Sequence, residues 1–162
     1  MTMQVRDGLT VRGRSFALLD LPLRQCDDPA VRARLALLCP TSTANWRGYV
    51  AGWAIRGGKL WLCALSANVG DGTKPPQHVE RRGLDWLFPD RPAPVHADWV
   101  SGELTSGRGK AQRFGMFGMG WPYLRRYRID AGIVVSSELI DNRKKLREDV
   151  RSGSGLLKLL EE

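Results

Sequence analysis

The 162-residue chain has little cysteine and little histidine, the side chains on which most structural metal sites and disulfide frameworks depend. Its three cysteines, Cys26, Cys39 and Cys63, are odd in number, widely spaced and without a CxxC pair. The two histidines, His78 and His96, are too few to complete a zinc site with them. We therefore predict reduced thiols, no metal and no cofactor.

Long apolar runs are also missing, and none approaches the roughly 18 residues that a membrane-spanning helix needs. The early charges of MTMQVRDGLTVRGRS are not followed by the apolar stretch of a secretory signal. A hydrophobic fraction of 43% with 26% charged residues is ordinary for a globular domain. These features predict one domain, a cytoplasmic location and no membrane partner.

What the chain does have is positive charge, with a formal net charge of +8. No acidic residue interrupts the basic side chains between Thr105 and Arg128, and a second basic cluster occupies 143–147. Such an excess attracts anionic partners, whether acidic protein, nucleic acid or phosphorylated ligand. An arginine-rich coding bias would produce the same composition, so charge alone does not define a function.

One helix and several hairpins can be predicted from the local pattern. Asp27 or Asp28 can cap a helix that starts at Pro29, with an apolar stripe through 31, 35 and 38. Residues 49–55 alternate as a strand, and Gly57-Gly58 is suited to a type I′ turn before a partner strand at 59–67. A second hairpin is predicted around the turn at 130–132.

Between these elements lie segments without clear periodicity. Residues 68–80 have loop composition, and the glycine-rich stretch 109–120 favours a close-packed loop or irregular strand over a helix. Together these elements predict an α+β fold with a mostly antiparallel sheet of about six to eight short strands and one main helix near 28–38. We expect a single domain over 1–145 and a flexible or short helical tail over 146–162.

The motifs STANWRGYVAGWAI, GGKLWL, LFP and VHADWVSGEL, in this order and spacing, resemble those of an uncharacterised bacterial protein family. The resemblance covers about residues 14–142. Asn45 stands where the family has cysteine, and His96 where it has phenylalanine. The family has no established function. Small proteins of this sort often occur beside contact-dependent toxins or defence genes, so the resemblance implies an immunity or partner-binding role by association.

A first candidate site combines His96 and Asp98, with Glu103 nearby. On one strand the first two would project to the same face, about 7 Å apart, as a base and an orienting carboxylate. No nucleophile motif accompanies them, and a histidine replaced by phenylalanine in relatives is a poor catalyst. Asp98 is more simply interpreted as a structural partner of Arg47 or of the turn at 41–45.

A second candidate is the cluster of Trp46, Arg47 and Tyr49. An arginine beside two aromatic rings can hold an anionic or planar ligand. The simpler interpretation is structural: Trp46 and Tyr49 pack in the core with Trp53 and Trp99, and Arg47 fastens the central hairpin to the Asp98 segment.

A third candidate is the basic stretch 105–128, in which aromatic residues alternate with cations. Charge plus stacking is typical of single-strand nucleic-acid binding, but no nucleic-acid motif is present. The predicted binding residues are Arg47, Arg108, Lys110, Arg113, Trp121, Arg125, Arg126 and Arg128.

From these patterns we expect a non-catalytic protein-binding module, an immunity protein or adaptor whose basic face engages an acidic partner such as a co-encoded toxin. One alternative is a small enzyme that acts on an anionic substrate through Asp98, His96 and Arg47. A further alternative is nonspecific nucleic-acid binding through 105–128.

Overall fold

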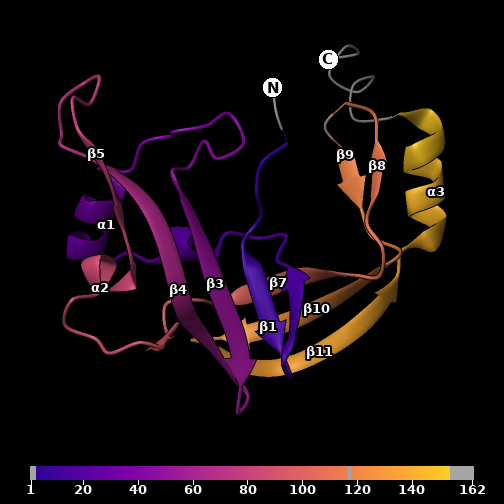
Figure 1. The fold of residues 1–162 in the computed structure, drawn as a ribbon. Helices are drawn as coiled ribbons and strands as arrows, with labels where there is room; N and C mark the ends of the chain where they lie inside the picture. The colour runs from indigo at the N-terminus through magenta and orange to yellow at the C-terminus, as the bar shows by residue number, and fades with distance from the viewer. Residues whose placement is uncertain (1–2, 117, 154–162) are drawn as a thin grey trace.

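A computed structural model describes residues 3–116 and 118–153 of the chain. The fold is α+β and dominated by strands, with a mixed nine-stranded sheet, a separate two-stranded sheet and three α-helices (Figure 1). The strands are β1 (Gly8–Val11), β2 (Arg14–Ala17), β3 (Tyr49–Arg56), β4 (Lys59–Gly70), β5 (Val79–Arg82), β6 (Val95–His96), β7 (Gly102–Arg108), β8 (Gln112–Phe114), β9 (Gly118–Gly120), β10 (Tyr123–Asp130) and β11 (Ile133–Asp141). The helices are α1 (Pro29–Leu35), α2 (Leu84–Leu87) and α3 (Arg143–Ser152), with a 3-10 turn at Pro22–Gln25.

The main sheet runs in the order β2-β1-β3-β4-β11-β10-β7, and β5 and β6 pair with β4. Most neighbours are antiparallel, but β1 and β3 are parallel, so the predicted antiparallel sheet is in fact mixed. The reason is the connection between the two strands. It contains β2, the 3-10 turn and α1, and this length of chain can cross over and return in the same direction.

The sheet curls so that its two ends meet. Leu18, just after β2, forms a bridge with Ser106 of β7, and the Leu19 amide donates to the Thr105 carbonyl at 2.9 Å. Asp20 adds a side-chain bond, because its Oδ2 accepts from the Thr105 amide at 2.6 Å. The curvature brings the β1–β2 hairpin and strands β10 and β11 to the walls of one pocket.

Two predicted turns are confirmed. Gly57 and Gly58 have φ angles of 57° and 71°, the positive pair that a type I′ hairpin requires. Ala131 and Gly132 turn the β10–β11 hairpin in the same way, at 45° and 77°. The β1–β2 turn was not predicted in detail, and there Arg12 adopts a positive φ of 51°. A long cationic side chain is thereby held at a hairpin tip.

The predicted helix near 28–38 is shorter than expected, since α1 spans Pro29–Leu35. Asp28 is its cap, with Oδ1 accepting from the amide of Ala30 at 2.8 Å. The ten-residue α3 is longer and spans Arg143–Ser152, so the first part of the tail predicted over 146–162 is helical. Leu146 of α3 is only 3% exposed and packs beside Gly120 of β9. The rest of the predicted tail, 154–162, lies outside the described residues.

The core lies inside the curled sheet and under α1 and α2. Trp53 is 1% exposed, and Trp99 meets it edge-on with ring centroids 6.3 Å apart. Trp46 differs from the expectation, because it is 60% exposed and contributes little to the core. Its backbone is tied instead to the N-terminal segment, where its amide donates to Gln4 Oε1 at 2.8 Å.

Candidate functional site

Asp7 is the buried partner of Arg47, which the sequence had not linked to it. The carboxylate is 1% exposed and lies directly before β1. Its Oδ1 accepts from Arg47 Nη2 at 2.7 Å and from the Ala51 amide at 2.9 Å, and its Oδ2 accepts from Trp53 Nε1 at 3.0 Å. Both oxygens are therefore satisfied, which a buried charge requires.

Arg47 is committed to this structural cluster. Its Nη1 donates to the Val5 carbonyl at 2.6 Å, and the guanidinium lies 5.0 Å from the Tyr49 ring centroid. Burial, and then the charge of Asp7, raises the pKa of Tyr49 to about 12. Arg47 thus fastens the segment before β1 to β3. Asp98 lies elsewhere, exposed and 3.7 Å from Arg91, so the expected contact between Arg47 and Asp98 does not form.

The other members of the predicted catalytic group have partners of their own. The His96 ring packs against Trp61 with centroids 5.3 Å apart, and its Nε2 lies 3.3 Å from the Gly132 carbonyl oxygen. Glu103 pairs with Arg126 at 3.5 Å. Within the described residues, no hydrogen bond or ion pair joins His96, Asp98 and Arg47 to one another.

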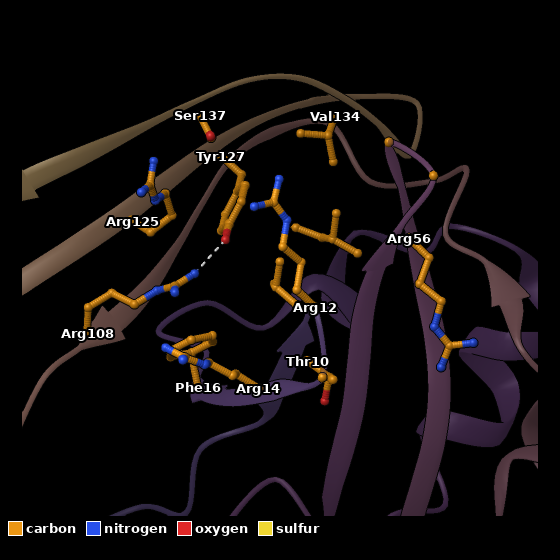
Figure 2. Close-up of a pocket in the computed structure, with 15 residues that line it drawn as sticks. Thr10, Arg12, Arg14, Phe16, Arg56, Arg108, Arg125, Tyr127, Val134 and Ser137 are labelled. Atoms are coloured by element: carbon orange, nitrogen blue, oxygen red, sulfur yellow. Dashed lines mark hydrogen bonds between the residues drawn. The ribbon is translucent and has the colours of Figure 1, made fainter.

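A cleft of about 1230 Å³ opens between the β1–β2 hairpin, the tip of the β3–β4 hairpin and the inner face of β7, β10 and β11 (Figure 2). Among the described residues that line it, five are arginines and none is acidic. We call it the arginine cleft, defined by Arg12, Arg14, Arg56, Arg108 and Arg125.

Each arginine reaches the cleft from a different element. Arg12 stands at the β1–β2 turn and points across the opening, whereas Arg56 ends β3 and points away from the others (Figure 2). Arg125 lies on the inner face of β10, opposite Leu139 of β11 in the register. These arginines come from distant parts of the sequence, and only the curl of the sheet brings them to one opening.

Arg108 is the most firmly positioned of the five. Its Nη2 donates to the Tyr127 hydroxyl at 2.8 Å (Figure 2), and its guanidinium lies 3.4 Å from the centroid of the Phe16 ring. Its Nε is buried without a partner among the described residues. The group is held by neutral contacts alone, so its full charge stays available to an anion.

The remaining predicted binding residues do not line the cleft. Arg126 is paired with Glu103 and with Glu138, the latter at 3.2 Å. Trp121 is 7% exposed and lies under Arg6, whose guanidinium is 5.5 Å from its ring. The others, Lys110, Arg113 and Arg128, are exposed at positions outside the cleft.

Sequence reasoning placed Arg108 and Arg125 among the binding residues but missed Arg12, Arg14 and Arg56. A charge run along the chain was the signal used, and these three residues lie outside the two basic runs at 105–128 and 143–147. A basic residue next to each of two hairpin turns, Arg12-Gly13 and Arg56-Gly57, was a usable clue, because tips of neighbouring hairpins can meet.

The described residues contain no group of three or more His, Cys, Asp or Glu side chains placed to hold a metal ion. Among the same residues, no helix combines the length and apolar character needed to cross a bilayer. Comparison with protein-family models, with curated proteins and with solved structures finds no match for this chain. The family resemblance therefore stays a prediction.

Proposed function

We propose that this protein is a non-catalytic binding module, of the immunity or adaptor type, that engages an acidic partner protein through the arginine cleft. The observation that carries the proposal is the set of five arginines around one opening without a lining carboxylate. The separate settings of His96, Asp98 and Arg47 support binding over catalysis.

Unpaired like charges at one opening cost free energy in the isolated protein, because they repel one another. Among the described residues, five arginines outside the cleft do form ion pairs: Arg47, Arg82, Arg91, Arg126 and Arg143. None of the cleft arginines takes part in these pairs. An anionic partner would neutralise the cleft, and the relief of this repulsion would add to the binding free energy.

The aromatic rings near the cleft favour a protein over a nucleic acid. Proteins that bind single-stranded nucleic acid expose aromatic ring faces on which the bases stack. Here Arg108 covers Phe16, Trp121 is buried, and the Arg143 guanidinium lies 5.4 Å from the Tyr123 ring. Attraction by charge is available in the cleft, but a free stacking platform is not.

A labelled peptide of about ten glutamates is the probe for this proposal, followed by fluorescence anisotropy. We expect binding that weakens roughly tenfold between about 50 mM and about 200 mM salt, because salt screens exposed charges. The double variant Arg12→Glu and Arg125→Glu should abolish it. The matched control, Arg81→Glu and Arg128→Glu, changes the net charge equally at exposed positions outside the cleft and should retain most of the affinity.

Two outcomes would count against the proposal. No binding in low salt would remove it, and equal losses in the two double variants would reduce it to attraction by net charge. A single-stranded DNA of matched charge serves as the competitor. If DNA binds more tightly than the peptide and shares its dependence on Arg12 and Arg125, the cleft is a nucleic-acid site.

A further inference from the structure

The outer edge of β11 lacks a strand partner over most of its length. On one side β11 pairs with β10 from Ile133 to Asp141, but on the other it pairs with β4 only at Ile133, opposite Lys59. The last bond on that side runs from the Val134 amide to the Gly58 carbonyl, at 2.8 Å. Among the described residues, no strand follows this edge over 135–141. About half of its backbone N–H and C=O groups are therefore unpaired.

The side chains of this edge do little to protect it. Natural edge strands usually carry lysine, proline or several charges, which discourage pairing with another chain. Between 133 and 140 the only charged residue is Glu138, and Val135 and Leu139 are 60% and 54% exposed. The short edge strand β5 differs, because three of its four residues, in the sequence VERR, are charged. In contrast to β5, β11 has an unprotected edge, which marks it as a place for an incoming strand.

The free edge of β11 is continuous with the arginine cleft. Val134 and Ser137 of β11 line the cleft together with Gly57 and Gly58, and β11 forms its upper border in Figure 2. In the register, Ser137 lies opposite Tyr127 and Leu139 opposite Arg125, so these residues share the inner face of the sheet. A strand added at β11 would lie about 4.8 Å farther out, with alternate side chains turned toward the cleft.

We propose that β11 accepts an extended acidic segment of the partner protein by strand addition, with alternate carboxylates of that segment facing Arg12 and Arg125. This inference rests on the proposed function, because it specifies how the same acidic partner is held. Backbone hydrogen bonds to the edge would supply affinity, and the period of two along a strand would match carboxylates to arginines. The preferred segment alternates acidic with small or β-branched residues.

A peptide of four Thr-Glu repeats is the probe, used with two backbone-methylated versions. In a strand, successive N–H groups point to opposite edges, so methylating all threonine amides blocks one edge and methylating all glutamate amides blocks the other. We expect the parent to bind. One methylated version should lose affinity about tenfold or more, because several backbone hydrogen bonds are lost. The other should bind like the parent.

Amide hydrogen exchange provides a second measurement on the protein itself. With the parent peptide bound, alternate amides within 135–141 should exchange more slowly, and amides of β5 should not change. Equal binding by both methylated peptides, equal loss by both, or unaltered exchange in β11 overturns strand addition. Strand addition is also overturned if the Thr-Glu peptide does not bind while the glutamate peptide binds through Arg12 and Arg125. In that case the proposed function still holds. If neither peptide binds, both proposals fail.

Discussion

Two arginine environments in this molecule differ in almost every respect except the residue itself. Arg47 is nearly buried, 2.7 Å from the carboxylate of Asp7, and also bonded to the Val5 carbonyl. Arg12 and Arg125 border an open cleft, and neither forms an ion pair with another described residue. In the first environment the described chain supplies the counter-charge, and in the second it does not.

The difference separates charge used for folding from charge available for binding. A buried guanidinium without its carboxylate would carry a large desolvation cost, so the Asp7–Arg47 pair must form within the chain. A half-exposed guanidinium keeps part of its hydration, so it needs no internal carboxylate and can bind an external anion. Arginine content alone does not distinguish the two, whereas the location of the acidic residues does.

The largest effect is expected from removing one member of the buried pair. Asp7→Ala should lower the free energy of unfolding by roughly 3–5 kcal/mol, because it leaves Arg47, Trp53 Nε1 and the Ala51 amide without their acceptor. Denaturant unfolding measures this. Asp98→Ala is the control, since Asp98 is exposed beside Arg91 and should cost about 0.5 kcal/mol or less. Equal effects of the two substitutions would contradict the assignment of Asp7 as the structural carboxylate.

Tyr49 tests the same cluster through pH. Its pKa is raised to about 12 by burial and by the negative charge of Asp7. In the unfolded chain a tyrosine loses its proton near its ordinary pKa of about 10, so stability should fall as pH rises from about 10 to about 12. The loss is of the order of 3 kcal/mol, because two pKa units correspond to about 2.7 kcal/mol.

The variant Tyr49→Phe should remove this contribution to the pH dependence. It should change stability little at neutral pH, because the Tyr49 hydroxyl makes no hydrogen bond of normal geometry and its interaction with Arg47 is weak. Unfolding curves at neutral and alkaline pH make the comparison. A strong neutral-pH loss in Tyr49→Phe would show that the contact of this hydroxyl with Arg47 stabilises the fold.

The local elements of this fold follow from short-range chemistry and could be predicted. Gly57-Gly58 permits the positive φ angles of its turn, and Asp28 before Pro29 provides a cap for α1. Residues adjacent in sequence decide these features. The parallel pairing of β1 with β3 depends instead on how a long connection crosses the sheet, and no local pattern reports that.

The candidate site was harder to predict for the same reason. Asp7 and Arg47 are far apart in sequence, and Asp7 resembles any turn residue before a glycine. Arg12 and Arg56 line the same cleft as Arg108 only because the sheet closes on itself. For Trp46 the prediction was wrong: this aromatic residue beside a strand was expected in the core, but it lies exposed.

The Tyr127 hydroxyl holds Arg108 in place at the cleft, and its removal should have an intermediate effect on affinity for the glutamate peptide. Tyr127→Phe removes the hydroxyl that accepts from Arg108 at 2.8 Å. Arg108 then loses its fixed position but keeps its charge, so affinity for the glutamate peptide should fall about threefold to fivefold, near the 1 kcal/mol of one hydrogen bond. Tyr123→Phe is the matched control and should leave affinity unchanged. A loss as large as that of Arg108→Ala would mean that the hydroxyl contacts the ligand directly.

Replacing Arg125 tests most directly whether the cleft carries unpaired positive charge, and it is expected to have the smallest effect on stability. Arg125→Ala should change the free energy of unfolding by about 0.5 kcal/mol or less, and the change should favour the variant in low salt, because one repelling charge is gone. Raising salt from about 50 mM to about 500 mM should stabilise the native protein more than the variant, since ions screen the remaining repulsion. Arg126→Ala is the control from the same strand. It lies between Glu103 and Glu138, so its removal should be neutral or destabilising, with the opposite response to salt. If Arg125→Ala behaved like Arg126→Ala, Arg125 would have a carboxylate partner within the chain, and the contrast between the two arginine environments would fail at that position.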